Sequence, residues 1–252
     1  MWELYDGGAD YSQTNDLAAS DPERLAHLQR LWLIEATKYQ VLPMDDRTGE
    51  RLDPVSAGRP TLIRGTSQQF FPGMGRLSES SVVSIKNRSF SVTAEVDVPE
   101  AGAGGVIIAQ GGRFGGWAVY AHEGRVRFVY NVLGIHEFTV EADEPVPAGT
   151  HEVRIEFAYD GGGLAKGGTV TIYHDGAAAG SGRVEATQPM IFSADETTDI
   201  GYESGTPVTA EYTVETSRFT GSIHWVQIDV GEDDHDHFID PTERLRVAIA
   251  RQ

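Results

Sequence analysis

Hydrophobic and polar residues alternate along most of the chain after Asn87. In the clearest run, residues 90–98, apolar side chains occupy every second position, the spacing of a β-strand with one buried face. Similar runs follow at residues 106–109, 117–121, 126–130, 138–140, 153–158, 170–173, 198–202 and 219–230. Turns such as Glu123-Gly124 and Asp175-Gly176 separate them. Many short strands joined in this way predict an antiparallel β-sandwich or barrel.

The N-terminal part of the chain follows a different pattern. Residues 2–5 alternate like a short strand, and Asp21 before Pro22 has the form of a helix N-cap with proline at the first helical position. We therefore expect a helix over residues 22–39. Its apolar positions recur at helical spacing and are Leu25, Leu28, Trp32 and Ala36. One strand and one helix cannot bury such a stripe alone, so we expect this segment to pack on a missing partner.

Two further segments complete the organisation. Residues 41–81 are irregular, rich in proline and glycine but with apolar Phe70 and Phe71, which predicts a linker wrapped over a neighbouring surface. The run from Asp240 to Glu243 resembles a helix N-cap with a glutamate three residues later, which predicts a C-terminal helix. We divide the chain into residues 1–58, an end piece plus linker, and residues 59–252, a β-sandwich.

Charge and composition exclude several classes of function. The chain of 252 residues has 38 acidic and 20 basic residues, a net charge of −18, which disfavours binding to nucleic acids and to anionic membranes. It has no cysteine, so disulfides, cysteine-ligated zinc and thiol nucleophiles are excluded. No apolar run is long enough for a membrane span, and the N-terminus does not resemble a signal peptide. By default we expect a cytoplasmic protein.

The N-terminal segment resembles the end of the C-terminal subdomain of the sulfatase family. The matching residues are Trp2, Leu4, Tyr5, Asp6, Asp10, Asn15, Asp16, Leu17, Ala18, Pro22, Leu25, Leu28 and Trp32, continuing into Val41-Leu42-Pro43. In sulfatases the corresponding segment forms a Trp-x-Leu-Tyr-Asp strand, an acidic turn, an Asn-Asp-Leu-Ala link and an amphipathic helix. The match covers roughly the first fifth of the chain.

The rest of the chain resembles the additional β-sandwich of longer bacterial arylsulfatases, of concanavalin A or laminin G type. The residues that carry this resemblance are 90–94, 105–112, 116–117, 149–151, 157–160, 170–173, 175–176 and 219–221, with Val226 and Ile228. We therefore expect a mainly β fold, an antiparallel concanavalin A-like jelly-roll sandwich with an N-terminal strand-helix segment and a C-terminal helix.

The sulfatase resemblance implies a sulfuric ester hydrolase with a formylglycine nucleophile and a divalent cation, calcium, held by carboxylates. The family's Cys/Ser-x-Pro-x-Arg motif and metal-binding aspartates lie upstream of the Trp-x-Leu-Tyr-Asp strand, and nothing precedes that strand here. We therefore expect no catalytic residue, metal site or cofactor in this chain, which alone should be inactive. Its expected partner is a sulfatase catalytic domain, or a second copy, through residues 2–39.

Two motifs have a catalytic interpretation and a simpler one. Residues 20–24 spell Ser-x-Pro-x-Arg, but helix capping explains them and the family's following Thr-Gly is absent. Residues 95–100 spell Glu-x-Asp-x-x-Glu, the arrangement of sandwich-fold β-glucanases, and would place Glu95 and Asp97 on one face. Pro99 interrupts the strand before Glu100, and the flanking sequence lacks tryptophans to line a sugar cleft. A solvated outer face is the simpler interpretation.

Acidic and histidine-containing clusters give no defined metal site. The run 232–237 offers oxygen and nitrogen ligands, but a charged run before a helix is more often a solvated linker. Asp195, Glu196 and Asp199 lack the ligand spacing of a calcium loop, and we interpret them as part of a loop.

Strand phase separates core from surface in residues 117–131. The residues in phase with the core are Trp117, Phe128 and Tyr130. Those on the opposite face are Tyr120, His122, Arg127 and Asn131. If the sandwich binds a glycan or a partner chain, these four are the candidate ligand-binding residues.

Three hypotheses of function remain open. The first is a non-catalytic C-terminal part of an arylsulfatase whose catalytic domain is missing from this chain. The second is a free-standing carbohydrate-binding or adhesion module, with carbohydrate as the ligand. The third is a glycan hydrolase that uses Glu95 and Asp97.

Overall fold

The computed structural model describes residues 2–42, 44, 63 and 65–231. The chain divides into two compact units, Met1–Thr48 and Gly49–Gln252, and each is described by itself. The boundary predicted at residue 58 and the helix predicted after Asp240 lie outside the described residues. Within the described residues, no helix combines the length and the hydropathy that a membrane span requires.

The N-terminal unit contains helix α1 (Pro22–Lys38), as predicted. A side-chain oxygen of Asp21 accepts a hydrogen bond from the backbone N–H of Arg24 at 3.1 Å. Pro22 occupies the first turn, where a missing N–H costs nothing. Residues 20–24 therefore form a helix cap, as the simpler interpretation of Ser-x-Pro-x-Arg predicted.

The strand predicted at residues 2–5 does not form. A strand needs a neighbouring strand to satisfy its backbone groups, and the described part of this unit supplies none. Leu4 instead bonds to the loop before α1: its carbonyl accepts the N–H of Leu17 at 2.7 Å. Trp2 packs edge-on against Trp32 of α1, with ring centroids 5.4 Å apart.

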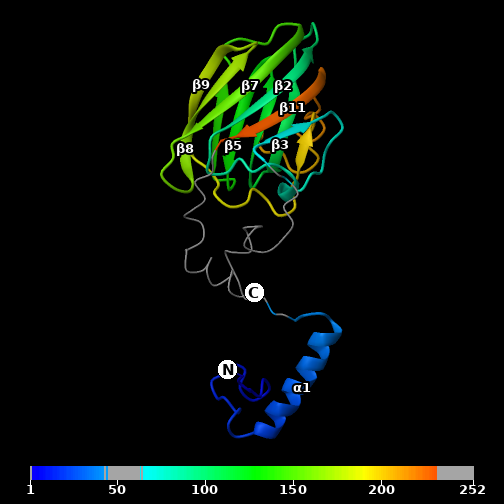
Figure 1. The fold of residues 1–252 in the computed structure, drawn as a ribbon, viewed down its shortest axis with the longest axis vertical. Helices are drawn as coiled ribbons and strands as arrows, with labels where there is room; N and C mark the ends of the chain where they lie inside the picture. Colours follow the sequence, from blue (N-terminus) through cyan, green and yellow to red (C-terminus); the bar gives the residue numbers. More distant parts are fainter. Residues whose placement is uncertain (1, 43, 45–62, 64, 232–252) are drawn as a thin grey trace. The chain divides into compact units, whose positions relative to one another are not determined.

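The second unit contains two antiparallel β-sheets, which Figure 1 shows as two layers. The strands of the first sheet are β1 (Ser67–Phe70), β2 (Phe90–Val98), β7 (Gly149–Tyr159), β8 (Lys166–His174), β9 (Ala177–Ala186) and β11 (Ser222–Val230). Those of the second are β3 (Gly105–Gly112), β4 (Gly115–His122), β5 (Arg125–Val132), β6 (His136–Glu141) and β10 (Thr198–Ile200). The orders are β1-β11-β2-β7-β8-β9 and β10-β3-β4-β5-β6. A short 3-10 helix, η2 (Glu79–Ser81), precedes β2.

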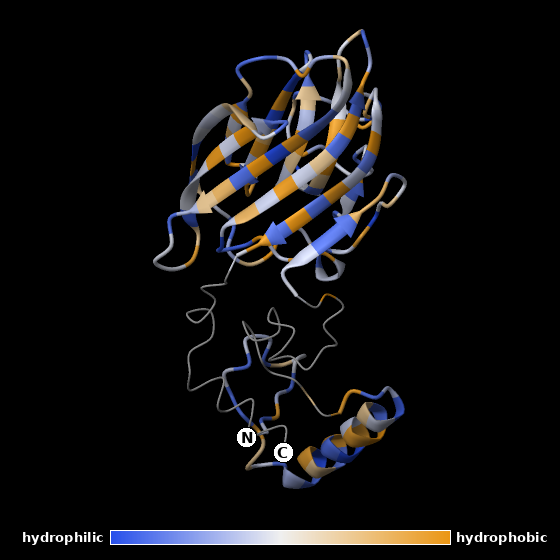
Figure 2. Cartoon of the chain, turned by 45° about the horizontal axis from the view of Figure 1, so that its top comes forward, coloured by the Kyte–Doolittle hydropathy of each residue, from blue (hydrophilic) through white to orange (hydrophobic). Residues whose placement is uncertain are grey.

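The core lies between the two sheets and follows the predicted alternation. Inward and outward residues alternate along the whole of β2, and Figure 2 shows the same alternation as bands of apolar and polar residues. Phe90 of β2 meets the opposite sheet at Trp117 and Phe128, with ring centroids 6.2 Å from each. Trp117, Phe128 and Tyr130 are buried in this core, as predicted. The fold is therefore the expected mainly β, antiparallel sandwich.

The prediction that residues 41–81 are only a linker is wrong for their last part. Residues 67–70 form strand β1, which pairs with β11 so that Phe70 lies opposite Val226. Phe70 is fully buried, and Ile63 packs against the same core. Phe70 and Ile63 thus belong to the sandwich, whereas Phe71 is exposed. Burial of a side chain such as Phe70 stabilises the fold by about 2 kcal/mol.

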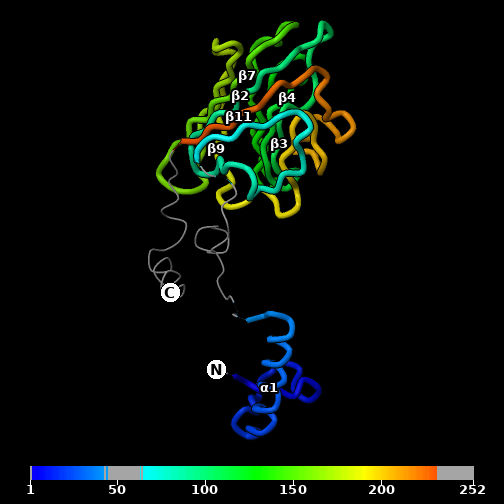
Figure 3. The backbone as a smooth tube through the Cα atoms, turned by 45° about the vertical axis from the view of Figure 1, so that its right-hand side comes forward, coloured from blue at the N-terminus to red at the C-terminus, as the bar shows by residue number. Residues whose placement is uncertain are grey.

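Chain topology brings distant segments together in the first sheet. Figure 3 shows β11, from the last described part of the chain, running beside β2. On its other edge β2 pairs with β7. The three strands β11, β2 and β7 therefore present one continuous outer surface whose residues come from three remote parts of the sequence.

Candidate ligand-binding site

The four predicted ligand-binding residues lie on the outer side of the five-stranded sheet, but this side is not open. Tyr120 is only 1% exposed and Asn131 only 5%. The chain between β10 and β11, residues 202–218, covers them, and we call it the cover segment. Figure 3 shows this segment, in yellow to orange, beside β3 and β4. His122 and Arg127 keep partial exposure.

Three of the four predicted residues, Tyr120, Arg127 and Asn131, bind the cover segment. The hydroxyl of Tyr120 donates to Glu211 at 2.7 Å, and Arg127 forms ion pairs with Glu211 and with Glu141 of β6. The amide of Asn131 donates to the carbonyl of Val208 at 2.8 Å. Their hydrogen-bonding groups are thus occupied within the protein. A ligand-binding role for them stays an untested prediction.

The apolar residues beneath the cover segment form a second small core. Its members are Val106, Ala109, Ala118, Tyr120, Val129, Val208 and Tyr212. Gly105 allows the end of the segment to approach β3, because a Cβ there would lie 2.3 Å from the carbonyl oxygen of Arg218. The N–H of Val106 donates to the carbonyl of Ser217 at 2.7 Å. The sheet face is therefore closed by packing as well as by polar contacts.

A buried carboxyl group, Glu203, lies within the cover segment. Its Oε1 accepts the N–H of Val208 at 3.0 Å, while its Oε2 and the Tyr212 hydroxyl are buried without a well-formed hydrogen bond among the described residues. Burial raises the pKa of Glu203 to about 8, although the Tyr212 hydroxyl and the Val208 N–H lower it in part. Burial, together with Glu203, raises the pKa of Tyr212.

Two of the three acidic residues considered as calcium ligands instead accept hydrogen bonds from loop residues. Asp199 lies in β10, not in a loop as predicted, and its Oδ2 accepts both the N–H and the hydroxyl of Ser204, at 2.9 and 2.7 Å. Glu196 accepts the hydroxyl of Thr206 at 2.8 Å. No group of three or more acidic or histidine side chains in the described residues is arranged to hold a metal ion. The run 232–237 lies outside those residues.

The Glu-x-Asp-x-x-Glu motif lies on the outer face of the six-stranded sheet. Glu95 and Asp97 both point outward from β2, as predicted, whereas Glu100 follows the end of the strand. Asp97 accepts the hydroxyl of Thr150 at 2.6 Å and pairs with the Nε2 of His224 at 2.8 Å. These hydrogen bonds hold the pKa of Asp97 below its usual value. The two motif carboxylates therefore have different surroundings: within the described part of the chain, Asp97 has hydrogen-bonding partners and the side chain of Glu95 has none.

Trp225 is the residue of this face that sequence analysis missed. It points outward from β11, since Val226 and Ile228 point into the core, and it is partly exposed. It lies directly opposite Glu95 of β2, which in turn lies opposite Glu152 of β7. The sequence next to Glu95 lacks a tryptophan, but strand pairing supplies one. The sequence did carry a signal for it: in the run 219–230 the apolar residues Val226 and Ile228 face inward, so the alternation places residue 225 on the outer face.

Two more rows of polar residues continue this face. Gln227, Thr93 and Arg154 form the next row, and Asp229, Ser91 and Glu156 the one after it. Successive outward positions on a strand lie about 7 Å apart, so the three rows form a polar surface beside Trp225. Because neighbouring strands lie about 5 Å apart, each row offers side chains close enough to contact one ligand.

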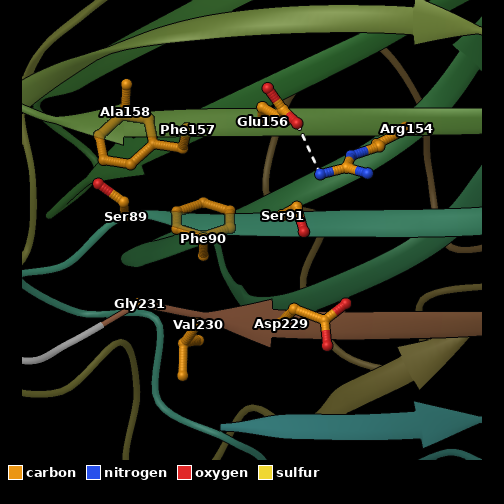
Figure 4. Close-up of a pocket in the computed structure, with 10 residues that line it drawn as sticks. All are labelled: Ser89, Phe90, Ser91, Arg154, Glu156, Phe157, Ala158, Asp229, Val230 and Gly231. Atoms are coloured by element: carbon orange, nitrogen blue, oxygen red, sulfur yellow. Dashed lines mark ion pairs between the residues drawn. The ribbon is translucent and has the colours of Figure 1, made fainter. Parts of the chain in front are cut away.

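A depression of about 390 Å³ lies at the far end of these rows. Figure 4 shows Arg154 and Glu156 of β7 beside Ser91 of β2, with Asp229 on β11. Arg154 and Glu156 form an ion pair at 2.6 Å. The other lining residues are Ser89, Phe90, Phe157, Ala158, Val230 and Gly231. The outer face of the six-stranded sheet, from Trp225 to this depression, is the candidate site.

Comparison with known proteins gives structural likeness only. No family model matches the chain, and no curated protein matches it. A carbohydrate-binding module (CBM40) of a Ruminococcus gnavus sialidase, bound to sialyllactose, shares 14% identity over 70% of this chain and 97% of its own, with a TM-score of 0.44. The mouse laminin α1 domains LG4-5 share 15% identity over 69% of this chain and 41% of their own, with a TM-score of 0.39. These are concanavalin A- or laminin G-like modules, and the sulfatase resemblance gains no support from them.

Proposed function

We propose that the β-sandwich is a non-catalytic module that binds carbohydrate on the outer face of its six-stranded sheet. The observation that carries the proposal is the position of Trp225, partly exposed on a sheet face and surrounded by polar side chains. An aromatic ring packs against the apolar face of a sugar ring, while carboxylates, amides and hydroxyls bond to the sugar hydroxyls. A shallow open face suits an extended saccharide.

The surroundings of Trp225 supply both kinds of contact. Glu95 and Glu152 provide hydrogen-bond acceptors beside the indole, and neither side chain has a hydrogen-bonding or ionic partner among the described residues. Gln227 and Thr93 follow in the next row. The opposite sheet face offers no such surface, because the cover segment occupies it. Among the described residues, the proposed site is therefore on the outer face that the cover segment leaves uncovered.

Replacement of Trp225 by alanine tests the proposal. We expect Trp225→Ala to weaken binding of a saccharide identified on a glycan array by about thirtyfold, because loss of a central aromatic contact typically costs about 2 kcal/mol. Titration calorimetry measures the change. Phe114→Ala is the control, because Phe114 is 72% exposed on the turn between β3 and β4. Absence of binding to every saccharide class on the array would refute the proposed function.

A second candidate is the accessory, C-terminal part of an arylsulfatase, and the surface of α1 favours it. Several large apolar residues of this helix are exposed, and they are Leu28, Leu31, Leu33 and Ile34. A patch of this kind marks a surface for a partner. The two candidates are compatible, since a carbohydrate-binding module can be joined to a separate catalytic domain.

The second candidate predicts association through α1. We expect the isolated chain to self-associate, and Leu31→Glu with Ile34→Glu to make it monomeric, because charges in the apolar patch oppose its burial. Light scattering measures the mass of both proteins. A wild-type chain that is monodisperse and monomeric would contradict this candidate. The chain alone is also expected not to hydrolyse p-nitrophenyl sulfate.

A further inference from the structure

The charged residues of the proposed binding face are unequally distributed. Its basic side chains already have acidic partners: Arg154 pairs with Glu156 at 2.6 Å, and the imidazole of His224 is hydrogen-bonded to Asp97 at 2.8 Å. On the same face of the outer strand β9, Arg183 pairs with Asp160. Glu95 and Glu152 remain, and no described cation neutralises them. The charge left for a ligand to meet is negative.

Glu95 and Glu152 stand directly opposite each other on neighbouring strands. Like charges in such a pair repel, and their Cβ atoms are only about 5 Å apart. A positively charged group between the two carboxylates removes this repulsion and forms charge-assisted hydrogen bonds with both. The two carboxylates would therefore favour a cationic group bound at the level of Trp225.

Trp225 adds a second contact suited to a cation. It lies next to Glu95 on the side away from Glu152, so the indole and the two carboxylates form one row. The face of an indole attracts a cation through the negative charge of its π system. A sugar ring over Trp225 that carries an amino group would therefore gain from both kinds of contact.

We propose that the saccharide bound on this face carries protonated amino groups, as oligomers of glucosamine do. This inference rests on the proposed function and specifies its ligand. Sulfated saccharides are disfavoured, because their negative charge meets Glu95, Glu152 and a protein of net charge −18. Neutral saccharides would keep the contact with Trp225 but gain nothing from the carboxylate pair.

The test compares two hexasaccharides that differ in charge. A hexamer of glucosamine in slightly acidic buffer is expected to bind roughly tenfold more tightly than the acetylated, neutral hexamer of N-acetylglucosamine, owing to contacts with the two carboxylates. Addition of about 1 M salt, which shortens the screening length to ~3 Å, should remove the difference. The double variant Glu95→Gln, Glu152→Gln should also remove it. The double variant Glu123→Gln, Glu144→Gln, at two exposed carboxylates outside this face, is the charge-matched control.

The outcomes separate this inference from the proposed function. If both hexamers bind equally, or a sulfated hexasaccharide binds more tightly, and Trp225→Ala weakens binding in each case, the amine inference is wrong and the proposed function stands. If the glucosamine hexamer binds but Trp225→Ala and the double variant leave its affinity unchanged, binding is non-specific attraction to an acidic protein and the inference also fails. If no saccharide binds, the proposed function fails as well.

Discussion

Raising the pH from about 5 to about 9 is expected to weaken the β-sandwich, because Glu203 is buried as a neutral acid. The pKa of Glu203 is about 8 in the folded protein, compared with 4.5 for an ordinary glutamate. Between these values the unfolded chain loses the proton and the folded chain retains it. Stability is therefore fully present below about pH 4.5 and falls until the pH passes about 8.

The size of this effect follows from the shift. Each unit of pKa difference corresponds to about 1.4 kcal/mol, so a rise from 4.5 to about 8 corresponds to a loss on the order of 5 kcal/mol. The main cause is burial of the carboxyl group within the cover segment, and the single backbone donor at one oxygen of Glu203 offsets the rise only in part. Asp199 and Glu196 raise the pKa further through their negative charge.

The measurement compares the wild type with Glu203→Gln by urea unfolding across this pH range. Glutamine has the same shape and no charge, so its stability should lack the decline due to Glu203. The difference between the two proteins cancels the other groups that titrate, such as His174, whose pKa burial lowers. We expect similar stabilities near pH 4.5 and a clear advantage of Glu203→Gln at pH 9. Parallel curves would show that Glu203 is not buried as described.

The alternation of apolar residues predicted the sandwich and its inner face. Residues 90–98, 117–121 and 126–130 carry apolar side chains, most of them β-branched or aromatic, at every second position, and burial of these residues forces one register. The strand β9 (Ala177–Ala186) was missed, because its residues are mostly alanine, glycine and polar. Such a strand is held by pairing with β8 rather than by its own preference, so its sequence carries little signal.

The outer faces were harder to predict, because the sequence does not reveal what covers them. Tyr120 and Asn131 have the outward phase that was assigned to them, yet the cover segment, some 80 residues later, buries both. Trp225 also has the outward phase but remains partly exposed, next to a glutamate about 130 residues earlier in the chain. The phase of the alternation alone shows which side chains face the core and which face outward. Whether an outward side chain is exposed to solvent depends on which distant segments of the chain cover it.

Replacement of Trp117 by alanine is expected to cause the largest loss of stability of any single change considered. The indole is fully buried between the sheets, and it stacks on Phe128 with ring centroids 6.4 Å apart. Its Nε1 donates to the side-chain oxygen of Gln110 at 2.9 Å. Truncation leaves a cavity that costs about 3–5 kcal/mol, and it removes the donor that satisfies Gln110 at a further cost of about 1–3 kcal/mol.

The matched replacement of Trp225 by alanine should, in contrast, have only a small effect on the free energy of unfolding. Trp225 lies on the outer face, so its truncation removes partly solvated surface and should alter the free energy of unfolding by only about 1 kcal/mol. Urea unfolding of both variants, followed by circular dichroism, measures the contrast. Equal losses in the two variants would mean that Trp225 belongs to the core. The face would then lack the exposed ring that the proposed carbohydrate site requires.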